Sequence, residues 1–136
     1  MTRVGIVGGL GPEATIDYYR RLMQVWAQHD PSTAPPLIID SIDVQRVLRL
    51  AASDRPALAA YIAESVQRLA DAGVDFAAIS ANTPHLVFDE VAAASPIPLI
   101  SIVEVCAEEA RRQRLRRPLL GARFTMEGPF YPAVFR

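Results

Sequence analysis

The chain has 136 residues, of which 51% are hydrophobic, and its formal net charge at pH 7 is −1. These values predict one globular domain with a substantial core, exclude a disordered chain, and provide no basic surface that would attract nucleic acid or an anionic membrane. No apolar run reaches the length of about 18 residues that a membrane span requires, and the first residues lead into a predicted strand without a charged leader, so we expect a cytoplasmic protein.

Short apolar runs rich in β-branched residues alternate with longer segments of helical spacing, which is typical of βαβ units. The pattern predicts an α/β fold with a mainly parallel sheet of about five strands flanked by helices. The predicted strands are a run that begins at Leu37 and residues 4–7, 75–79, 97–102 and 119–120. The predicted helices cover residues 13–28, 56–72, 84–93 and 103–115, and the first has an apolar face formed by Ile16, Tyr19, Met23 and Trp26.

A glycine-rich turn at residues 8–12 joins the first strand to the first helix. The backbone N–H groups of Gly9, Leu10 and Gly11 can bind a phosphate or a carboxylate at the start of that helix. The turn lacks the full G-x-G-x-x-G spacing, so a nucleotide-binding domain is the least favoured hypothesis. The alternative is that these glycines only permit a tight turn.

Polar side chains follow the third and the fifth predicted strands. Asn82, Thr83 and His85 come after the strand at 75–79, and Arg123 and Thr125 come after the strand at 119–120. Because the carboxyl ends of parallel strands meet at one edge of a sheet, we expect these groups and the glycine turn to form one cleft, suited to an amino acid or a dicarboxylate. The alternative for the first cluster is an ordinary loop whose Asn or Thr caps a helix.

Three other residues bear on the site. Arg46, after the second strand, can act as a carboxylate clamp, although an exposed loop arginine is the commoner case. Cys106 is the only cysteine, and the apolar residues around it in the sequence predict a buried, inert thiol. One cysteine and two histidines that are far apart in the sequence, His29 and His85, predict no metal site.

Three separated motifs, in order along the whole chain, carry a family resemblance. Residues 6–15, Ile-Val-Gly-Gly-Leu-Gly-Pro-Glu-Ala-Thr, followed by Asp-Tyr-Tyr-Arg-Arg at 17–21, resemble the opening of the aspartate/glutamate racemase family. Residues 82–85, Asn-Thr-Pro-His, resemble its first active-site loop, and residues 120–128 resemble its next substrate-binding loop. The resemblance implies an amino-acid racemase that needs no pyridoxal phosphate or other cofactor. It also implies two pseudo-symmetric α/β lobes, of which residues 1–136 form the N-terminal one.

The resemblance also implies two catalytic cysteines, one per lobe, on opposite faces of the substrate α-carbon. A thiol whose pKa is lowered by neighbouring N–H groups can act as a base near neutral pH. Here Ala81 stands at the first cysteine position, and the Gly-Cys-Thr motif of the second lobe is not among these residues. Ala122 also replaces a threonine that is usual in the family. We therefore assign no catalytic residue and expect weak or absent racemisation.

The resemblance implies a small acidic amino acid, such as aspartate or glutamate, as the substrate. Asn82, Thr83 and Thr125 are expected to contact its amino and carboxylate groups, while His85 orients a neighbour, binds a carboxylate or caps its own helix. The alternative function is a non-catalytic module that binds amino acids or dicarboxylates, or a truncated relic of a racemase. Because a single lobe would expose apolar surface, we also expect a homodimer or a tendency to aggregate.

Overall fold

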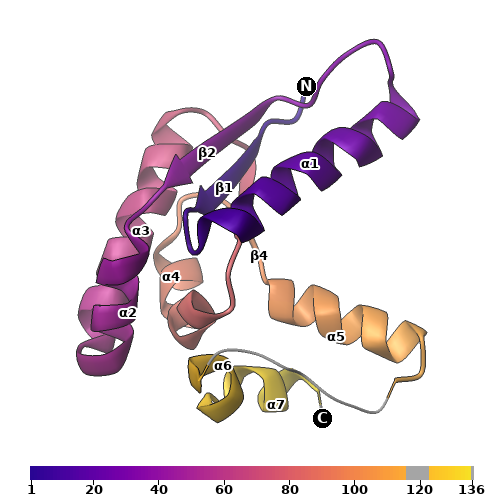
Figure 1. The fold of residues 1–136 in the computed structure, drawn as a ribbon. Helices are drawn as coiled ribbons and strands as arrows, with labels where there is room; N and C mark the ends of the chain where they lie inside the picture. Colours follow the sequence, from indigo (N-terminus) through magenta and orange to yellow (C-terminus); the bar gives the residue numbers. More distant parts are fainter. Residues whose placement is uncertain (116–122, 136) are drawn as a thin grey trace.

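A parallel β-sheet with helices on both faces forms the centre of the fold (Figure 1). The computed structural model describes residues 1–115 and 123–135. Within them the sheet has four strands in the order β2-β1-β3-β4, namely β1 (Val4–Gly8), β2 (Leu37–Ser41), β3 (Phe76–Ile79) and β4 (Leu99–Ile100). The α/β class and the parallel pairing are confirmed. The fifth strand predicted at 119–120 lies outside the described residues.

Helices connect successive strands, as parallel pairing requires. The described helices are α1 (Pro12–His29), α2 (Val44–Ser53), α3 (Arg55–Asp71), the 3-10 helix η1 (Thr83–Val87), α4 (Phe88–Ala94), α5 (Ile102–Arg112), α6 (Arg123–Glu127) and α7 (Phe130–Val134). Figure 1 shows α1 and α5 on one side of the sheet and α2, α3 and α4 on the other. None of the helices in the described part of the chain is both long and apolar enough to cross a membrane.

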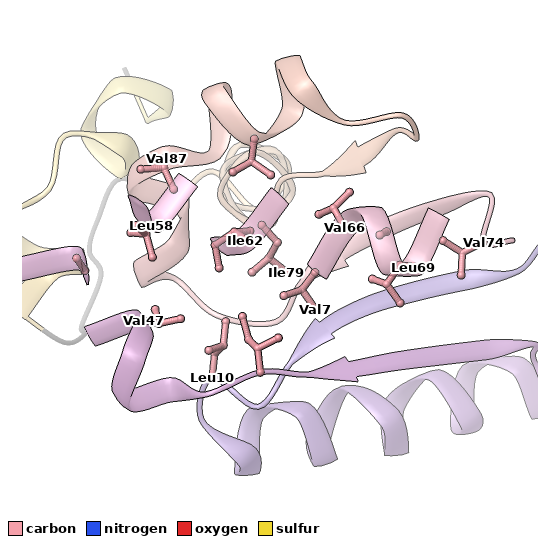
Figure 2. Close-up of a cluster of buried hydrophobic side chains, with 14 residues drawn as sticks. Val7, Leu10, Val47, Leu58, Ile62, Val66, Leu69, Val74, Ile79 and Val87 are labelled. Atoms are coloured by element: carbon pink, nitrogen blue, oxygen red, sulfur yellow. The ribbon is translucent and has the colours of Figure 1, made fainter. Parts of the chain in front are cut away.

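The main hydrophobic core lies between the sheet and the helices α2, α3 and α4 (Figure 2). Val7 and Ile79 project from β1 and β3 toward Leu58 and Ile62 of α3, and all four side chains are fully buried. Each buried aliphatic side chain of this size contributes roughly 1.5–3 kcal/mol relative to an exposed one. The core therefore fixes the carboxyl ends of β1 and β3 side by side, where their loops begin.

Helix α2 was not predicted. Asp43 caps its N-terminus by accepting hydrogen bonds from the backbone N–H groups of Gln45 and Arg46. Val47 and Ala51, four residues apart, are buried on its inner face. The capping residue and this spacing are both visible in the sequence. The helix lies where a loop was expected after the second strand.

The apolar face predicted for the first helix is partly wrong. Ile16 and Tyr19 are 42% and 47% exposed, whereas Thr15 is buried and Tyr18 is half-buried. A threonine can lie on the inner face because its hydroxyl group finds partners there: it accepts from the backbone N–H of Gly9 at 2.9 Å and lies 3.1 Å from the Ser80 hydroxyl. The helix is therefore rotated so that a polar residue faces the sheet.

Two other predictions are corrected around β4. The predicted strand at 97–102 is limited to Leu99–Ile100. Pro98 has no backbone N–H to donate to a neighbouring strand, and Ser101 already caps α5 by accepting a hydrogen bond from the Glu104 backbone N–H. Cys106 is exposed rather than buried. Helix α5 buries Val103 and Ala107, four residues apart, and this leaves Cys106 on its uncovered side.

Candidate functional site

A cleft of about 410 Å³ lies at the carboxyl ends of the strands. This is the edge at which parallel α/β sheets bind ligands, because the loops and the helix N-termini converge there. Its walls come from the loops after β1 and β3 and from the helices α1, α2, α5 and α6. The lining residues are Leu10, Gly11, Ala14, Tyr18, Val44, Val47, Leu48, Ser80, Ala81, Asn82, Thr83, Pro84, Ile102 and Thr125.

The glycine turn after β1 forms one wall. Gly9 has φ +85°, and a Cβ atom there would lie 2.6 Å from the backbone oxygen of Ile42, so only glycine fits. Its N–H is already bonded to the Thr15 hydroxyl. Leu10 and Gly11 line the cleft, and the space beside Gly11 is open. Of the three predicted residues, Gly9 thus shapes the turn while Leu10 and Gly11 face the cleft.

The loop after the neighbouring strand β3 forms another wall. Ala81, Asn82 and Thr83 line the cleft in succession, and the Asn82 Oδ1 atom accepts a hydrogen bond from the Tyr131 hydroxyl at 2.7 Å. Ser80 is buried, and its hydroxyl is 3.2 Å from the Val7 carbonyl oxygen as well as close to Thr15. Asn82 and Thr83 are therefore the side chains of this loop with polar groups available to a ligand.

His85 lies behind this loop rather than among the lining residues. It is 4% exposed, its ring stacks on Phe88 with centroids 5.1 Å apart, and its Nδ1 atom is 2.8 Å from the Ala81 carbonyl oxygen. Burial lowers the pKa of His85, although the hydrogen bonds to the backbone at Ala81 and Asn82 oppose this shift. The His85 ring is therefore neutral, and its Nδ1–H donates to the Ala81 carbonyl oxygen and so holds the loop in place.

The structure separates the two residues predicted after the fifth strand. Thr125 in α6 is 2% exposed and lines the cleft, because α6 packs against η1. Arg123, two residues earlier on another face of the helix, is exposed, and its Nε atom pairs with Glu127 Oε2 at 3.0 Å. Thr125 thus joins Asn82 and Thr83 in the cleft, whereas Arg123 does not.

Arg46 lies on the outer side of α2. Its guanidinium carbon is 4.2 Å from the centroid of the Tyr61 ring, and Arg46 is not among the lining residues. The described lining residues are therefore all uncharged. They supply an amide, the hydroxyl groups of threonine and tyrosine, and apolar walls from α2.

Sequence reasoning missed two tyrosines at this site. Tyr18 of α1 lines the cleft, and burial, together with Asp17 and Cys106, raises its pKa. Tyr131 of α7 reaches the site through Asn82. The position of Tyr18 three residues after Thr15 on α1 was a signal in the sequence. Asn82 and Tyr131 are 49 positions apart, so the sequence gives no local sign of their contact. With their hydroxyl groups protonated at neutral pH, both tyrosines act as hydrogen-bonding groups rather than bases.

Comparison with known proteins covers nearly the whole chain. Residues 7–136 match the model of the Asp/Glu/hydantoin racemase family. The broad specificity amino-acid racemase RacX of Bacillus subtilis (strain 168) is 26% identical over 98% of this chain and 60% of its own length. The crystal structure of a Yersinia pestis protein assigned as an Asp/Glu racemase superposes with a TM-score of 0.87 at 33% identity, over 98% of this chain and 59% of that one.

A second crystal structure, of an aspartate racemase homologue from Pyrococcus horikoshii OT3, superposes with a TM-score of 0.82 at 32% identity, over 99% of this chain and 60% of that one. The chain thus spans about 60% of the length of the relatives it matches. The family match covers more than half of the chain and agrees with the three sequence motifs, whose described members include the cleft residues Gly11, Asn82 and Thr125. The chain belongs to the Asp/Glu/hydantoin racemase family.

Proposed function

We propose that this chain is a racemase-like lobe that binds the α-amino and α-carboxylate groups of a small amino acid in the cleft. The observation that carries the proposal is the convergence of Asn82, Thr83 and Thr125 at the carboxyl ends of the strands. An amide and two hydroxyl groups offer both donors and acceptors, as an ammonium and a carboxylate on one carbon require. The family membership supports an amino acid as the ligand.

The proposed substrate class is a small acidic amino acid. The names of the Yersinia and Pyrococcus relatives support aspartate or glutamate, whereas RacX has broad specificity. A side-chain carboxylate needs a cation, and we propose Arg46 of α2 for this role. To reach a ligand, its guanidinium must leave the Tyr61 ring, an exposed contact of roughly 0.5–1 kcal/mol.

The proposed chemistry uses no pyridoxal phosphate. The family resemblance supports this, because it implies inversion of the α-carbon without a cofactor. Inversion then needs one base on each face of the α-carbon, and Ala81 gives the described cleft a methyl group where the resemblance implies a thiol. We therefore expect the chain alone to racemise aspartate or glutamate weakly or not at all.

A second candidate function is a non-catalytic module that binds amino acids or dicarboxylates. Ala81 and the uncharged lining favour it, because such a wall can bind a ligand but offers no base that titrates near neutral pH. A relic that folds without binding is the remaining outcome. The two functions differ in turnover and share the binding step, so both must be measured on the same preparation.

The test combines calorimetry with NMR. L-Aspartate, L-glutamate, L-alanine and succinate are titrated into the chain, and the loss of the α-proton signal of each amino acid is followed in D₂O against a buffer blank. Saturable binding that Asn82→Ala weakens, with Gln24→Ala on the exposed side of α1 as the control, supports the proposal. Racemisation well above the blank would contradict the expected inactivity, and absence of binding would contradict both functions.

We also propose that the chain forms a homodimer. A groove of about 560 Å³ between α1 and α5 is almost entirely apolar, and Ile100 and Val105 in it are exposed. Self-association is the simplest way to bury such a surface. Light scattering at micromolar concentration should give a dimer that Val105→Glu dissociates and Ile16→Glu, on another face of α1, does not. A monodisperse wild-type monomer would contradict the proposal.

A further inference from the structure

A hydrogen bond joins the last described helix to the centre of the cleft. The Tyr131 hydroxyl donates to the Oδ1 atom of Asn82 at 2.7 Å, across 49 residues of sequence. Tyr131 is 7% exposed, and α7, which carries it, packs against α5. The loop after β3 is thus held by a residue of α7, which is far from it in the sequence.

This contact determines which end of the Asn82 amide is free. A carboxamide carries an acceptor oxygen on one side and two N–H donors on the other. Tyr131 occupies the oxygen, and among the described residues none accepts a hydrogen bond from the Asn82 Nδ2 atom. Because Asn82 lines the cleft, its free amide presents donors to a ligand there.

We propose that Tyr131 is a positioning residue, which holds the Asn82 amide so that its N–H donors face a carboxylate group in the cleft. The inference rests on the proposed function, since it names the ligand group that Asn82 recognises. A carboxylate accepts hydrogen bonds only, so the opposite amide orientation would direct an oxygen at it. Tyr131 would thus set the preference of this subsite for a carboxylate over an ammonium group.

The surroundings of Tyr131 suit a fixed donor. Its ring lies between those of Phe130 and Phe135, with centroid separations of 5.4 and 5.8 Å. Burial, with smaller effects of Cys106 and Tyr18, raises the pKa of Tyr131 to about 12. The hydroxyl therefore keeps its proton at neutral pH, and a phenylalanine at this position would keep the ring contacts while removing the donor.

Tyr131→Phe isolates the proposed effect. Without the hydroxyl, the Asn82 oxygen loses its partner and the amide can rotate, so the N–H donors face the ligand for only part of the time. Losing a single hydrogen bond of this kind corresponds to a roughly 5- to 10-fold weaker Kd. The matched control is Tyr19→Phe, since Tyr19 is exposed on α1 and outside the cleft.

The experiment is an NMR titration of the ¹⁵N-labelled chain with L-aspartate, carried out on the wild type, Tyr131→Phe, Asn82→Ala, the double variant and the control. We expect Tyr131→Phe to move the side-chain NH₂ resonances of Asn82 before any ligand is added, and then to weaken Kd. In the Asn82→Ala background the same change should have no further effect, because Tyr131 acts through Asn82. A loss of fold stability alone would weaken both backgrounds equally.

Two results would overturn the inference: Asn82 side-chain resonances that are unchanged in Tyr131→Phe, or an effect on Kd that is the same with and without Asn82. If the wild type does not bind L-aspartate but the Asn82 resonances respond to Tyr131→Phe, the contact is real and the proposed function fails. If the wild type binds and the resonances do not respond, the proposed function stands and Tyr131 has no positioning role.

Discussion

Thr15→Val tests whether one buried hydroxyl group holds the two walls of the cleft together. The Thr15 Oγ1 atom accepts from the Gly9 N–H at 2.9 Å and lies 3.1 Å from the Ser80 hydroxyl. Gly9 belongs to the turn after β1, and Ser80 belongs to the loop after β3. Valine has nearly the same shape as threonine, so this substitution removes the hydrogen bonds without creating a cavity.

The magnitude follows from what each partner loses. The Gly9 N–H has no other acceptor among the described hydrogen bonds, and a buried donor without a partner costs about 1–3 kcal/mol. The Ser80 hydroxyl retains the Val7 carbonyl oxygen at 3.2 Å, so its loss is smaller. We therefore expect Thr15→Val to lower the free energy of unfolding by about 1–3 kcal/mol.

The assay is equilibrium unfolding in urea, with the same slope required for both proteins so that the midpoints can be compared. Thr2→Val, at an exposed position near the N-terminus, is the matched control and should change the free energy by less than about 0.5 kcal/mol. A Thr15→Val variant as stable as the wild type would refute the reasoning. It would mean that water or another group satisfies the Gly9 N–H at no cost.

Three further predictions concern single positions. Gly9→Ala should lower the free energy of unfolding in urea by more than about 1 kcal/mol. The alanine Cβ atom would lie 2.6 Å from the Ile42 backbone oxygen, at a residue with a positive φ. A variant as stable as the wild type would contradict this. The pKa of His85 is lowered in the folded state, so the unfolded chain binds the proton more tightly. The free energy of unfolding should therefore fall as the pH drops below about 6.5, by at most about 1.4 kcal/mol per pH unit. His85→Gln should flatten this slope in urea titrations between pH 7.5 and 5.5, and His29→Gln, at an exposed position, should not. Ala81→Cys should raise α-proton exchange of L-aspartate in D₂O at least about tenfold, since a general base contributes factors of 10² to 10⁴; no increase by NMR would argue against this wall facing the α-carbon.

The parts of the fold predicted correctly depend on local sequence. The first three strand runs, the glycine turn and the helix at 56–72 follow from periodicity and from residues with special backbone preferences, and the structure places them within a few residues. Helix α2 was equally local, with Asp43 as its cap and Val47 and Ala51 on its inner face. It was missed because the segment was interpreted as a loop that carries an arginine.

The errors on α1 and Cys106 come from contacts between distant residues. The face of α1 depends on a hydrogen bond between Thr15 and Ser80, and periodicity alone favours the apolar Ile16 instead. The exposure of Cys106 depends on how α5 packs against the sheet, which the apolar sequence around it does not reveal. Motifs identified the cleft loops, but they did not indicate which side chains of those loops face inward.

The charge of the cleft connects these results to the choice of ligand. The described lining residues carry no charge, while an acidic amino acid brings two carboxylates and one ammonium group. One carboxylate and the ammonium suit the Asn82 amide and the threonine hydroxyls, so the second carboxylate decides the preference. Moving Arg46 away from Tyr61 costs roughly 0.5–1 kcal/mol, and a charge-assisted hydrogen bond to a carboxylate contributes about 1.5–3 kcal/mol. If Arg46 turns from the Tyr61 ring to a ligand in the cleft, it should favour L-aspartate over L-alanine by about 0.5–2.5 kcal/mol. Equal affinities for the two amino acids would mean that Arg46 stays on the Tyr61 ring.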